Sequence, residues 1–163
     1  MLLRGLRCRL PKRKIDNYVA GIGADAKGTV PDLTVLLKDN DVAVRQSALT
    51  ALGSIGPEAK AAIPAILEQF KDKHAQSRIV AARSLSQIGA DVKSVPVLTD
   101  LLRDKEEEVR MHAAASLGNI GPGAKSAAPA LTELLTDKEE SVRTTAAEAL
   151  EKIKMEGNGR PAR

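Results

Sequence analysis

The sequence of 163 residues has almost no aromatic side chains: Tyr18 and Phe70 are the only two, and tryptophan is absent. β-Sandwiches and barrels are poor candidates, because strands favour aromatic and β-branched residues. Hydrophobic residues still make up 43% of the chain. A core of alanine, leucine, isoleucine and valine without rings suits closely packed helices. The composition therefore predicts an all-α protein.

Cysteine is nearly absent too, since Cys8 is the only one. A single cysteine excludes an intrachain disulfide and a metal cluster built on cysteines. No apolar run approaches the length of a signal-peptide core or of a membrane span. We therefore expect a soluble, cytoplasmic protein without a membrane partner.

The body of the chain lacks the positive charge that the overall net charge of +4 suggests, because the excess of basic residues lies at the two ends of the sequence. Residues 1–14 carry six positive charges and no negative one, and residues 152–163 carry four positive and one negative. Residues 15–151 hold 15 basic and 20 acidic residues, so the body is mildly acidic. With no aromatic groups for base stacking, nucleic-acid binding would be confined to the basic N-terminal tail.

A repeat runs through the body. Prolines fall at Pro31, Pro64, Pro96 and Pro129, with steps of 33, 32 and 33 residues. The same steps separate Asp39, Asp72, Asp104 and Asp137, and Arg45, Arg78, Arg110 and Arg143. Self-similarity of this kind at a fixed period is typical of solenoid proteins.

Each repeat is predicted to form two helices. The first runs from the proline to the aspartate, with a short helical turn before it, and the second spans about residues 41–55 in the first repeat and ends at Ile-Gly. Val44, Ala48, Leu52 and Ile55 mark the buried face of the second helix. One hairpin cannot cover such a face, but stacked neighbours can.

The repeat register predicts the domain organisation. A basic tail (1–14) precedes a repeat domain (15–156), and a disordered tail (157–163) follows it. The domain comprises an N-terminal half repeat (15–23) and four full repeats: repeat 1 (24–56), repeat 2 (57–89), repeat 3 (90–121) and repeat 4 (122–156). The half repeat is assigned because YVAGIG aligns with ALGSIG at the end of repeat 1. The chain is thus expected to be a monomer or a fragment of a longer array.

The pattern D-x-x-x-x-V-R-x-x-A, followed by L-G-x-I-G and P-x-L-x-x-L-L, resembles the HEAT-like repeat of the phycobilisome-lyase type over residues 18–154. The resemblance implies an all-α fold, a right-handed α-solenoid whose second helices line the concave face. It also implies a structural ladder between repeats, made by the turn aspartates and the helix arginines: Asp39, Arg45, Asp72, Arg78, Asp104, Arg110, Asp137 and Arg143. This repeat serves scaffolds, lyase subunits, a metal-dependent hydroxylase and DNA-repair proteins alike, so it does not define one activity.

Repeat 2 departs most from the pattern. Ser77 replaces the valine before the arginine, and Gln69 replaces a leucine of the first helix. Because both changes put polar groups at core positions, we expect this repeat to be the least protected in hydrogen exchange.

Solvent-facing positions of the second helices vary between repeats while the buried positions barely change. The residues expected to bind a partner there are Gln46, Thr50, Gln76, Ile79, Val80, Arg83, Glu108, Met111, His112, Ala115, Thr144 and Glu148. Ile79, Val80 and Met111 are candidate apolar anchors. Alternatively, Ile79 and Val80 tighten packing against the next repeat. Nearby acidic residues favour a partner with basic character.

No catalytic, cofactor or metal site is predicted. His74 and His112 are each followed by alanine, so the His-Glu pairs that carry iron in the HEAT-like hydroxylase are missing. Cys8 has no base beside it in the sequence. The glycine-rich stretch from Gly21 to Gly28 lacks Walker spacing and recurs as a repeat connector.

Three functions remain open at this stage. The leading interpretation is a non-catalytic scaffold that binds another protein on the concave face. The second is a subunit or chaperone of a bilin-lyase-like enzyme, although the chain has no aromatic groove for a tetrapyrrole. The third is nucleic-acid binding through residues 1–14.

Overall fold

The computed structural model of the chain describes residues 26–155, and within this range every regular element is a helix. The described residues divide into two compact units, residues 26–88 (unit 1) and 89–155 (unit 2). The tail 1–14, the half repeat 15–23 and the tail 157–163 expected from the sequence lie outside the described residues. Each unit contains helical hairpins, so the predicted all-α solenoid class is confirmed.

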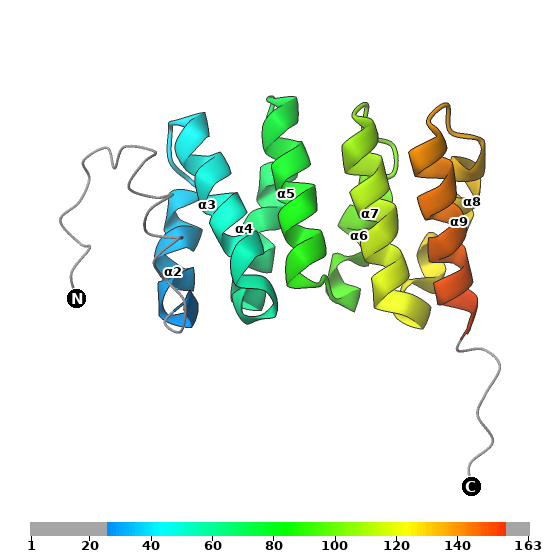
Figure 1. The fold of residues 1–163 in the computed structure, drawn as a ribbon, viewed down its shortest axis with the longest axis horizontal. Coiled ribbons are helices and arrows are strands. Elements are labelled where there is room, and N and C mark those ends of the chain that lie inside the picture. The colour runs from blue at the N-terminus through cyan, green and yellow to red at the C-terminus, as the bar shows by residue number, and fades with distance from the viewer. Residues whose placement is uncertain (1–25, 156–163) are drawn as a thin grey trace, which may run out of the picture. The chain divides into compact units, whose positions relative to one another are not determined.

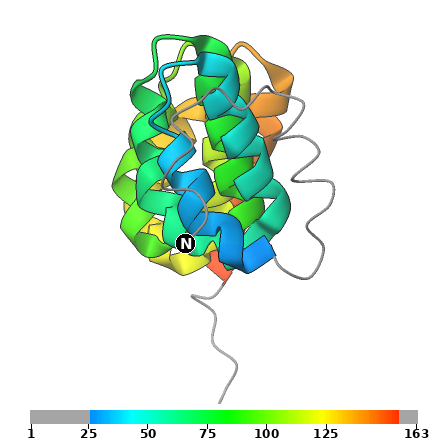
Figure 2. The ribbon, with the colours of Figure 1, turned by 90° about the vertical axis from the view of Figure 1, so that its left-hand side faces the viewer.

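Unit 1 packs its two long helices side by side (Figures 1 and 2). Its elements are α2 (Ala26–Leu36), α3 (Val42–Ile55), the 3₁₀ turn η1 (Gly56–Ala62), α4 (Ile63–Glu68), the 3₁₀ turn η2 (Gln69–Lys71) and α5 (Ala75–Ile88). Helices α3 and α5 are the predicted second helices of repeats 1 and 2, and α2 and α4 are the first helices.

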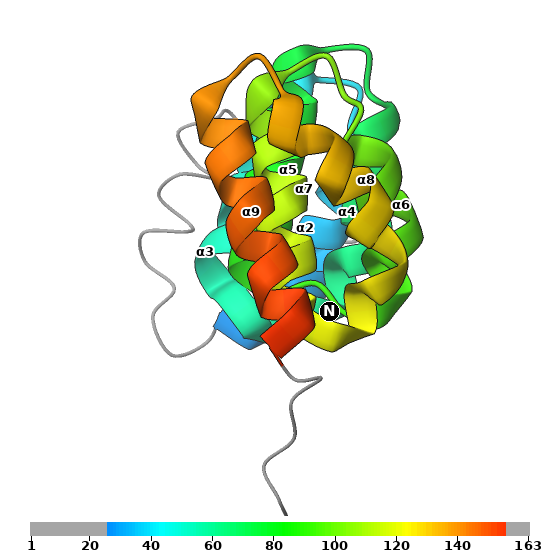
Figure 3. The same ribbon diagram turned by 90° about the vertical axis from the view of Figure 1, so that its right-hand side faces the viewer.

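Unit 2 repeats this arrangement, with α7 and α9 side by side and α6 and α8 behind them (Figures 1 and 3). Its elements are η3 (Val92–Ser94), α6 (Val95–Leu101), α7 (Glu107–Ile120), η4 (Gly121–Ala127), α8 (Ala128–Glu133), η5 (Leu134–Thr136) and α9 (Glu140–Met155). Pro64, Pro96 and Pro129 lie at the start of a first helix, where the missing N–H costs little, whereas Pro31 lies inside α2.

The predicted ends of the second helices are confirmed. Helix α3 starts after Asp41, whose side chain accepts a hydrogen bond from the Ala43 N–H at 2.9 Å, a common N-cap. It ends at Gly56, which has φ +71°, and α7 ends the same way at Gly121, with φ +68°. Only glycine adopts this left-handed conformation without a steric cost. The first helices end differently, because η2 and η5 tighten their last turns in repeats 2 and 4.

The buried face predicted for the second helices forms the core of each unit. In α3, Val44 is 8% exposed, while Ala48 and Leu52 are fully buried. The matching valine, alanine and leucine of α7 and α9 are buried too. The pattern weakens at the helix end, where Ile55 and Ile120 are only partly buried although they repeat in register.

Neighbouring second helices approach closely within each unit, because small residues face each other. A Cβ added to Gly118 in α7 would lie 2.8 Å from the Cα of Ala149 in α9. In unit 1, a Cβ added to Gly53 would lie 3.1 Å from the Cα of Ser84. Both distances are shorter than ordinary contacts, so these positions exclude any larger residue without movement of the helices.

The polar residues that mark repeat 2 have partners inside unit 1. Gln69 donates a hydrogen bond from Nε2 to the carbonyl oxygen of Leu37 at 2.9 Å. Ser77 is fully buried, and its Oγ lies 3.4 Å from Nε2 of Gln46. These contacts offset part of the cost of polar groups in the core. The low protection expected for repeat 2 stays a prediction.

Candidate functional site

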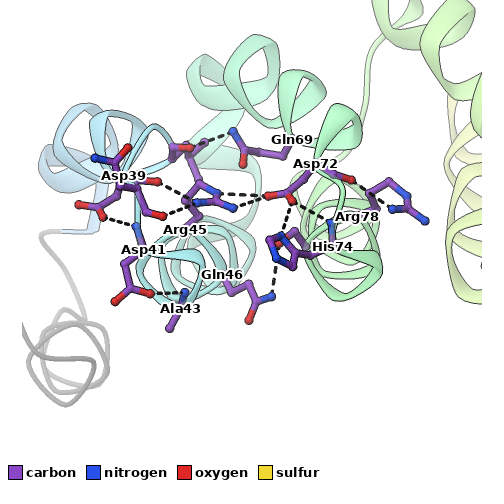
Figure 4. Close-up of polar contacts among 12 residues, drawn as sticks. Asp39, Asp41, Ala43, Arg45, Gln46, Gln69, Asp72, His74 and Arg78 are labelled. Carbon is purple, nitrogen blue, oxygen red and sulfur yellow. Dashed lines mark hydrogen bonds and ion pairs between the residues drawn. The ribbon is translucent and has the colours of Figure 1, made fainter.

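In unit 1, Arg45 connects the turn of its own repeat to the turn of the next one (Figure 4). Its guanidinium donates to Oδ2 of Asp72 at 2.6 Å from Nη2 and 3.2 Å from Nε, and to the carbonyl oxygen of Asp39 at 2.9 Å. Arg78 in turn donates to the carbonyl oxygen of Asp72 at 3.1 Å. Four of the expected ladder residues therefore lie together in unit 1.

Unit 2 holds the same arrangement with better geometry. Arg110 donates to both carboxylate oxygens of Asp137, at 2.8 Å from Nε and 2.9 Å from Nη2, and to the carbonyl oxygen of Asp104 at 2.9 Å. Arg143 donates to the carbonyl oxygens of Asp137 and Lys138 at 2.8 and 3.0 Å. Two parallel hydrogen bonds between a guanidinium and a carboxylate are stronger than a single ion contact.

The ladder carboxylates are held in their charged form. The hydrogen bond from Arg110 lowers the pKa of Asp137, and it outweighs the burial that would raise it. Burial would also raise the pKa of Asp72, but the His74 backbone N–H and the Arg45 guanidinium together hold that pKa well below its ordinary value. Both aspartates therefore remain ionised at neutral pH, as a lasting ion pair requires.

Two details of the ladder were not visible in the sequence. Each arginine donates hydrogen bonds to carbonyl oxygens of its own repeat. Arg45 and Arg110 also donate to an aspartate carboxylate of the following repeat, 27 positions later. The ring of His74 also joins unit 1's ladder, with Nδ1 lying 2.9 Å from Oδ1 of Asp72. The repeated spacing of arginine and aspartate was the only signal for these contacts, and it does not distinguish the two aspartates near each arginine.

The expected partner-binding residues fall into three groups by exposure. Thr50, Gln76, Arg83, Thr144 and Glu148 are exposed, and Gln46, Val80, Glu108, Met111, His112 and Ala115 are partly buried. Ile79 is only 8% exposed and belongs to the core. The expectation that Ile79 is an exposed anchor for a partner is therefore wrong.

We define the second-helix surface of each unit by a chosen set of exposed or partly buried residues on its two long helices. In unit 1 they are Ala43, Gln46, Thr50, Gln76, Val80 and Arg83. In unit 2 they are Glu107, Glu108, Met111, His112, Ala115, Glu140, Thr144 and Glu148. Glu107 and Glu140 join the expected set because both are exposed at the first residue of their helices.

The described residues offer little to other kinds of site. No group of three or more metal-binding side chains comes together among residues 26–155. Within the same range, no helix combines the length and apolar character that crossing a membrane requires. His74 lies in the turn before α5 in unit 1, and His112 lies in α7 in unit 2.

Comparison with solved structures supports the same architecture. An engineered protein of known crystal structure is 26% identical, with a TM-score of 0.73, and the match covers 87% of this chain and 71% of the other. The complex of CpcE and CpcF of phycocyanin lyase from Nostoc sp. PCC7120 is 22% identical, with a TM-score of 0.70 over 90% of this chain and 59% of the other. A designed armadillo repeat protein in complex with the peptide (KR)4 is 20% identical, with a TM-score of 0.68 over 87% of this chain and 69% of the other.

At the level of sequence, no curated protein matches the chain. The family model for HEAT repeats, by contrast, matches residues 17–86 and 63–151, which together take in most of the sequence and nearly all of the described residues. The two matches overlap at residues 63–86, within repeat 2, as expected of a periodic sequence. The chain therefore belongs to the family of HEAT repeat proteins.

Proposed function

We propose that this protein is a non-catalytic scaffold that binds another protein through the second-helix surfaces of its repeats. The main support for this proposal is a contrast between two repeat positions on the same helices. The arginine of the ladder occurs in all four repeats, whereas the solvent-facing position five residues later is Thr50, Arg83, Ala115 and Glu148 in turn. A constant frame with a changing surface is how a repeat protein encodes specificity.

The comparisons support this proposal at the level of fold. HEAT and armadillo repeats share the stacked-hairpin architecture, and one of the similar structures is a designed armadillo protein that holds a peptide. The ladder residues are engaged with one another and with backbone carbonyls, so we assign them to stability and no chemical step. The proposal retains the cytoplasmic location expected from the sequence.

A subunit or chaperone of a bilin-lyase-like enzyme is the second proposal. Its support is the likeness to the CpcE–CpcF complex, in which the match covers 59% of the other chain. A tetrapyrrole bound to the purified protein would absorb visible light. Co-expression with a bilin source, followed by an absorption spectrum, distinguishes this function from a colourless scaffold. The nucleic-acid alternative rests on residues 1–14, outside the described residues.

The test of the scaffold proposal compares two sets of surface changes in the full chain. One variant carries Thr50→Arg, Arg83→Glu, Met111→Arg and Glu148→Arg on the second-helix surfaces. The control variant carries Val35→Arg, Glu68→Arg, Asp100→Arg and Glu133→Arg, four exposed and repeat-equivalent positions on the first helices. We expect quantitative capture experiments to show partners lost by the first variant and kept by the control.

The proposal fails if both variants capture the same proteins as the unchanged chain. Equal thermal unfolding profiles for the three proteins would establish that a loss of binding reflects the surface and not the fold. This check is reasonable because all of these side chains are exposed or partly buried, and surface substitutions usually change stability little.

A further inference from the structure

The second-helix surface of unit 2 is one continuous patch and not two separate helix faces. Helices α7 and α9 lie side by side and pack against each other (Figure 1). Gly118 and Ala149 allow the backbones to touch, with only 2.8 Å between a Cβ added at Gly118 and the Cα of Ala149. Side chains of both helices can therefore contact one bound segment at the same time.

This patch is acidic, unlike its counterpart in unit 1. Glu107 and Glu140 are exposed at the repeat position that Val42 and Ala75 occupy in unit 1. Glu148 is exposed where unit 1 has Thr50 and Arg83. The charge difference is not inherited from the repeat, because the same positions carry no acid in unit 1.

The basic residues of the same two helices do not neutralise the patch near its acidic end. Arg110 is only 8% exposed in its side chain and is paired with Asp137. Arg143 donates to two backbone carbonyls of the turn before α9. Lys152 lies one helical turn after Glu148, where it donates to Oδ1 of Asn119 at 3.3 Å. It is therefore remote only from Glu107 and Glu140, at the helix starts. The exposed carboxylates therefore create a local negative potential that attracts cations.

An apolar strip lies within the acidic patch. Met111 and Ala115 of α7 are partly buried, one helical turn apart, on the helix that carries Glu107. Methionine adapts its shape to irregular partners. Lysine and arginine combine a long aliphatic stem with a terminal cation, so the stem can pack on an apolar strip while the cation reaches a carboxylate. Acidic side chains beside an apolar strip therefore favour a ligand with long basic side chains, which neither feature would indicate alone.

From these observations we infer that the second-helix surface of unit 2 binds a lysine- and arginine-rich segment of a partner protein. The inference rests on the proposed scaffold function and names the chemical class of the partner for one unit. Long basic side chains contact Met111 and Ala115 with their stems and Glu107, Glu140 and Glu148 with their cations. Unit 1, whose surface is neutral to basic, does not bind this segment.

The experiment measures the fluorescence anisotropy of two labelled peptides with the full chain. One probe contains lysine and arginine interspersed with serine, and the other has glutamate and aspartate in the same places. The test variant is Glu107→Gln, Glu140→Gln and Glu148→Gln. The matched control is Glu58→Gln, Asp100→Asn and Glu133→Gln, which removes the same charge from exposed positions outside the patch. Met111→Ala tests the apolar contact.

The basic peptide should bind the unchanged chain and the control, and the test variant should bind about tenfold more weakly at low salt. Met111→Ala should weaken binding by a factor that does not change with salt, since it removes apolar contact and no charge. The acidic peptide should not bind through the patch.

Three outcomes overturn the inference. Equal loss in the test and control variants would show a general effect of net charge. Retained affinity in the test variant would place the basic peptide elsewhere. A rise in affinity on deleting residues 1–14 would assign the patch to the chain's own basic tail and not to a partner. None of these results would contradict the scaffold function. That proposal fails only if substitutions on both second-helix surfaces leave the capture of partners unchanged.

Discussion

Arg110 and Asp137 form a two-point ion pair between successive repeats, with N–O distances of 2.8 and 2.9 Å and with side chains that are 8% and 9% exposed. The arginine belongs to α7, and the aspartate belongs to the turn before α9. The same guanidinium also satisfies the carbonyl oxygens of Asp104 and Lys105. One side chain thus fixes the turn of its own repeat and the position of the next.

We expect Arg110→Ala to lower the free energy of unfolding by about 3 kcal/mol, because it leaves the buried Asp137 carboxylate without a cation. Urea denaturation monitored by circular dichroism measures the change. The control is Arg103→Ala, whose pair with Glu133 has side chains that are 66% and 65% exposed. Exposed pairs contribute roughly 0.5 kcal/mol, so the control should unfold almost as the unchanged protein does. Similar losses in both variants would contradict the ladder's structural role.

The ladder also predicts how stability changes in acid. The hydrogen bond from Arg110 lowers the pKa of Asp137 in the folded protein, so the unfolded chain binds the proton more tightly. The stabilisation is fully present above the unfolded pKa of about 3.9 and is lost as the pH falls through the lower folded value. Thermal unfolding measured across acidic pH should therefore show Tm decreasing below about pH 4.

Asp137→Asn provides the control for this pH dependence. The variant should be less stable at neutral pH and should lose less on acidification, because one of the ionised groups linked to folding is gone. Asp72, whose pKa is lowered by the same kind of contacts, should contribute a parallel loss in the unchanged protein. Parallel curves for Asp137→Asn and the unchanged chain would show that this pair does not contribute to acid stability.

The helical frame could be predicted from the sequence because each signal occurs in several copies. Asp41 before α3, Gly56 after it and the buried Leu52 between them are local features, and local rules determine helix ends and faces. The repeat makes the prediction more secure, since four copies of a pattern in one register do not arise by chance. The hairpin order follows directly from that periodicity.

The surface could not be predicted as well. Ile79 lies at the border between the packed and the open side of α5, and only the neighbouring helices determine that it is 8% exposed. The carboxylate partner of Arg45 also depends on tertiary structure, because Asp39 and Asp72 occupy the same position of successive repeats. Both questions concern how one repeat meets another, which hydrophobic periodicity within a helix does not describe.

Close packing between α7 and α9 gives a third prediction. Gly118→Ala should lower the free energy of unfolding by about 1–3 kcal/mol, because the new Cβ would meet the backbone of Ala149. Gly28→Ala in α2 is the control, since a Cβ there meets nothing within 4 Å. In that helix alanine should stabilise by up to about 1 kcal/mol through its higher helix propensity. Denaturant midpoints that shift in the same direction for both variants would contradict the close approach.

The last prediction compares two serines at the same position of successive repeats. Ser84 places its Oγ 2.8 Å from the carbonyl oxygens of Leu49 and Val80, whereas the Oγ of Ser116 is buried and has no hydrogen-bond partner among residues 26–155. Ser84→Ala should lower the free energy of unfolding by about 1 kcal/mol, because a hydrogen bond is lost. Ser116→Ala should raise it by up to about 1 kcal/mol, because an unsatisfied hydroxyl is removed from the core.

The same chemical change should therefore have opposite signs at Ser84 and Ser116. Urea titrations of the two single variants, fitted with a common slope, measure both effects against the unchanged chain. Helix propensity favours alanine over serine equally at both sites, so it cannot produce a difference in sign. If Ser116→Ala destabilises as much as Ser84→Ala, the Ser116 hydroxyl has a partner in solution, and the core of unit 2 is better satisfied than its described contacts indicate.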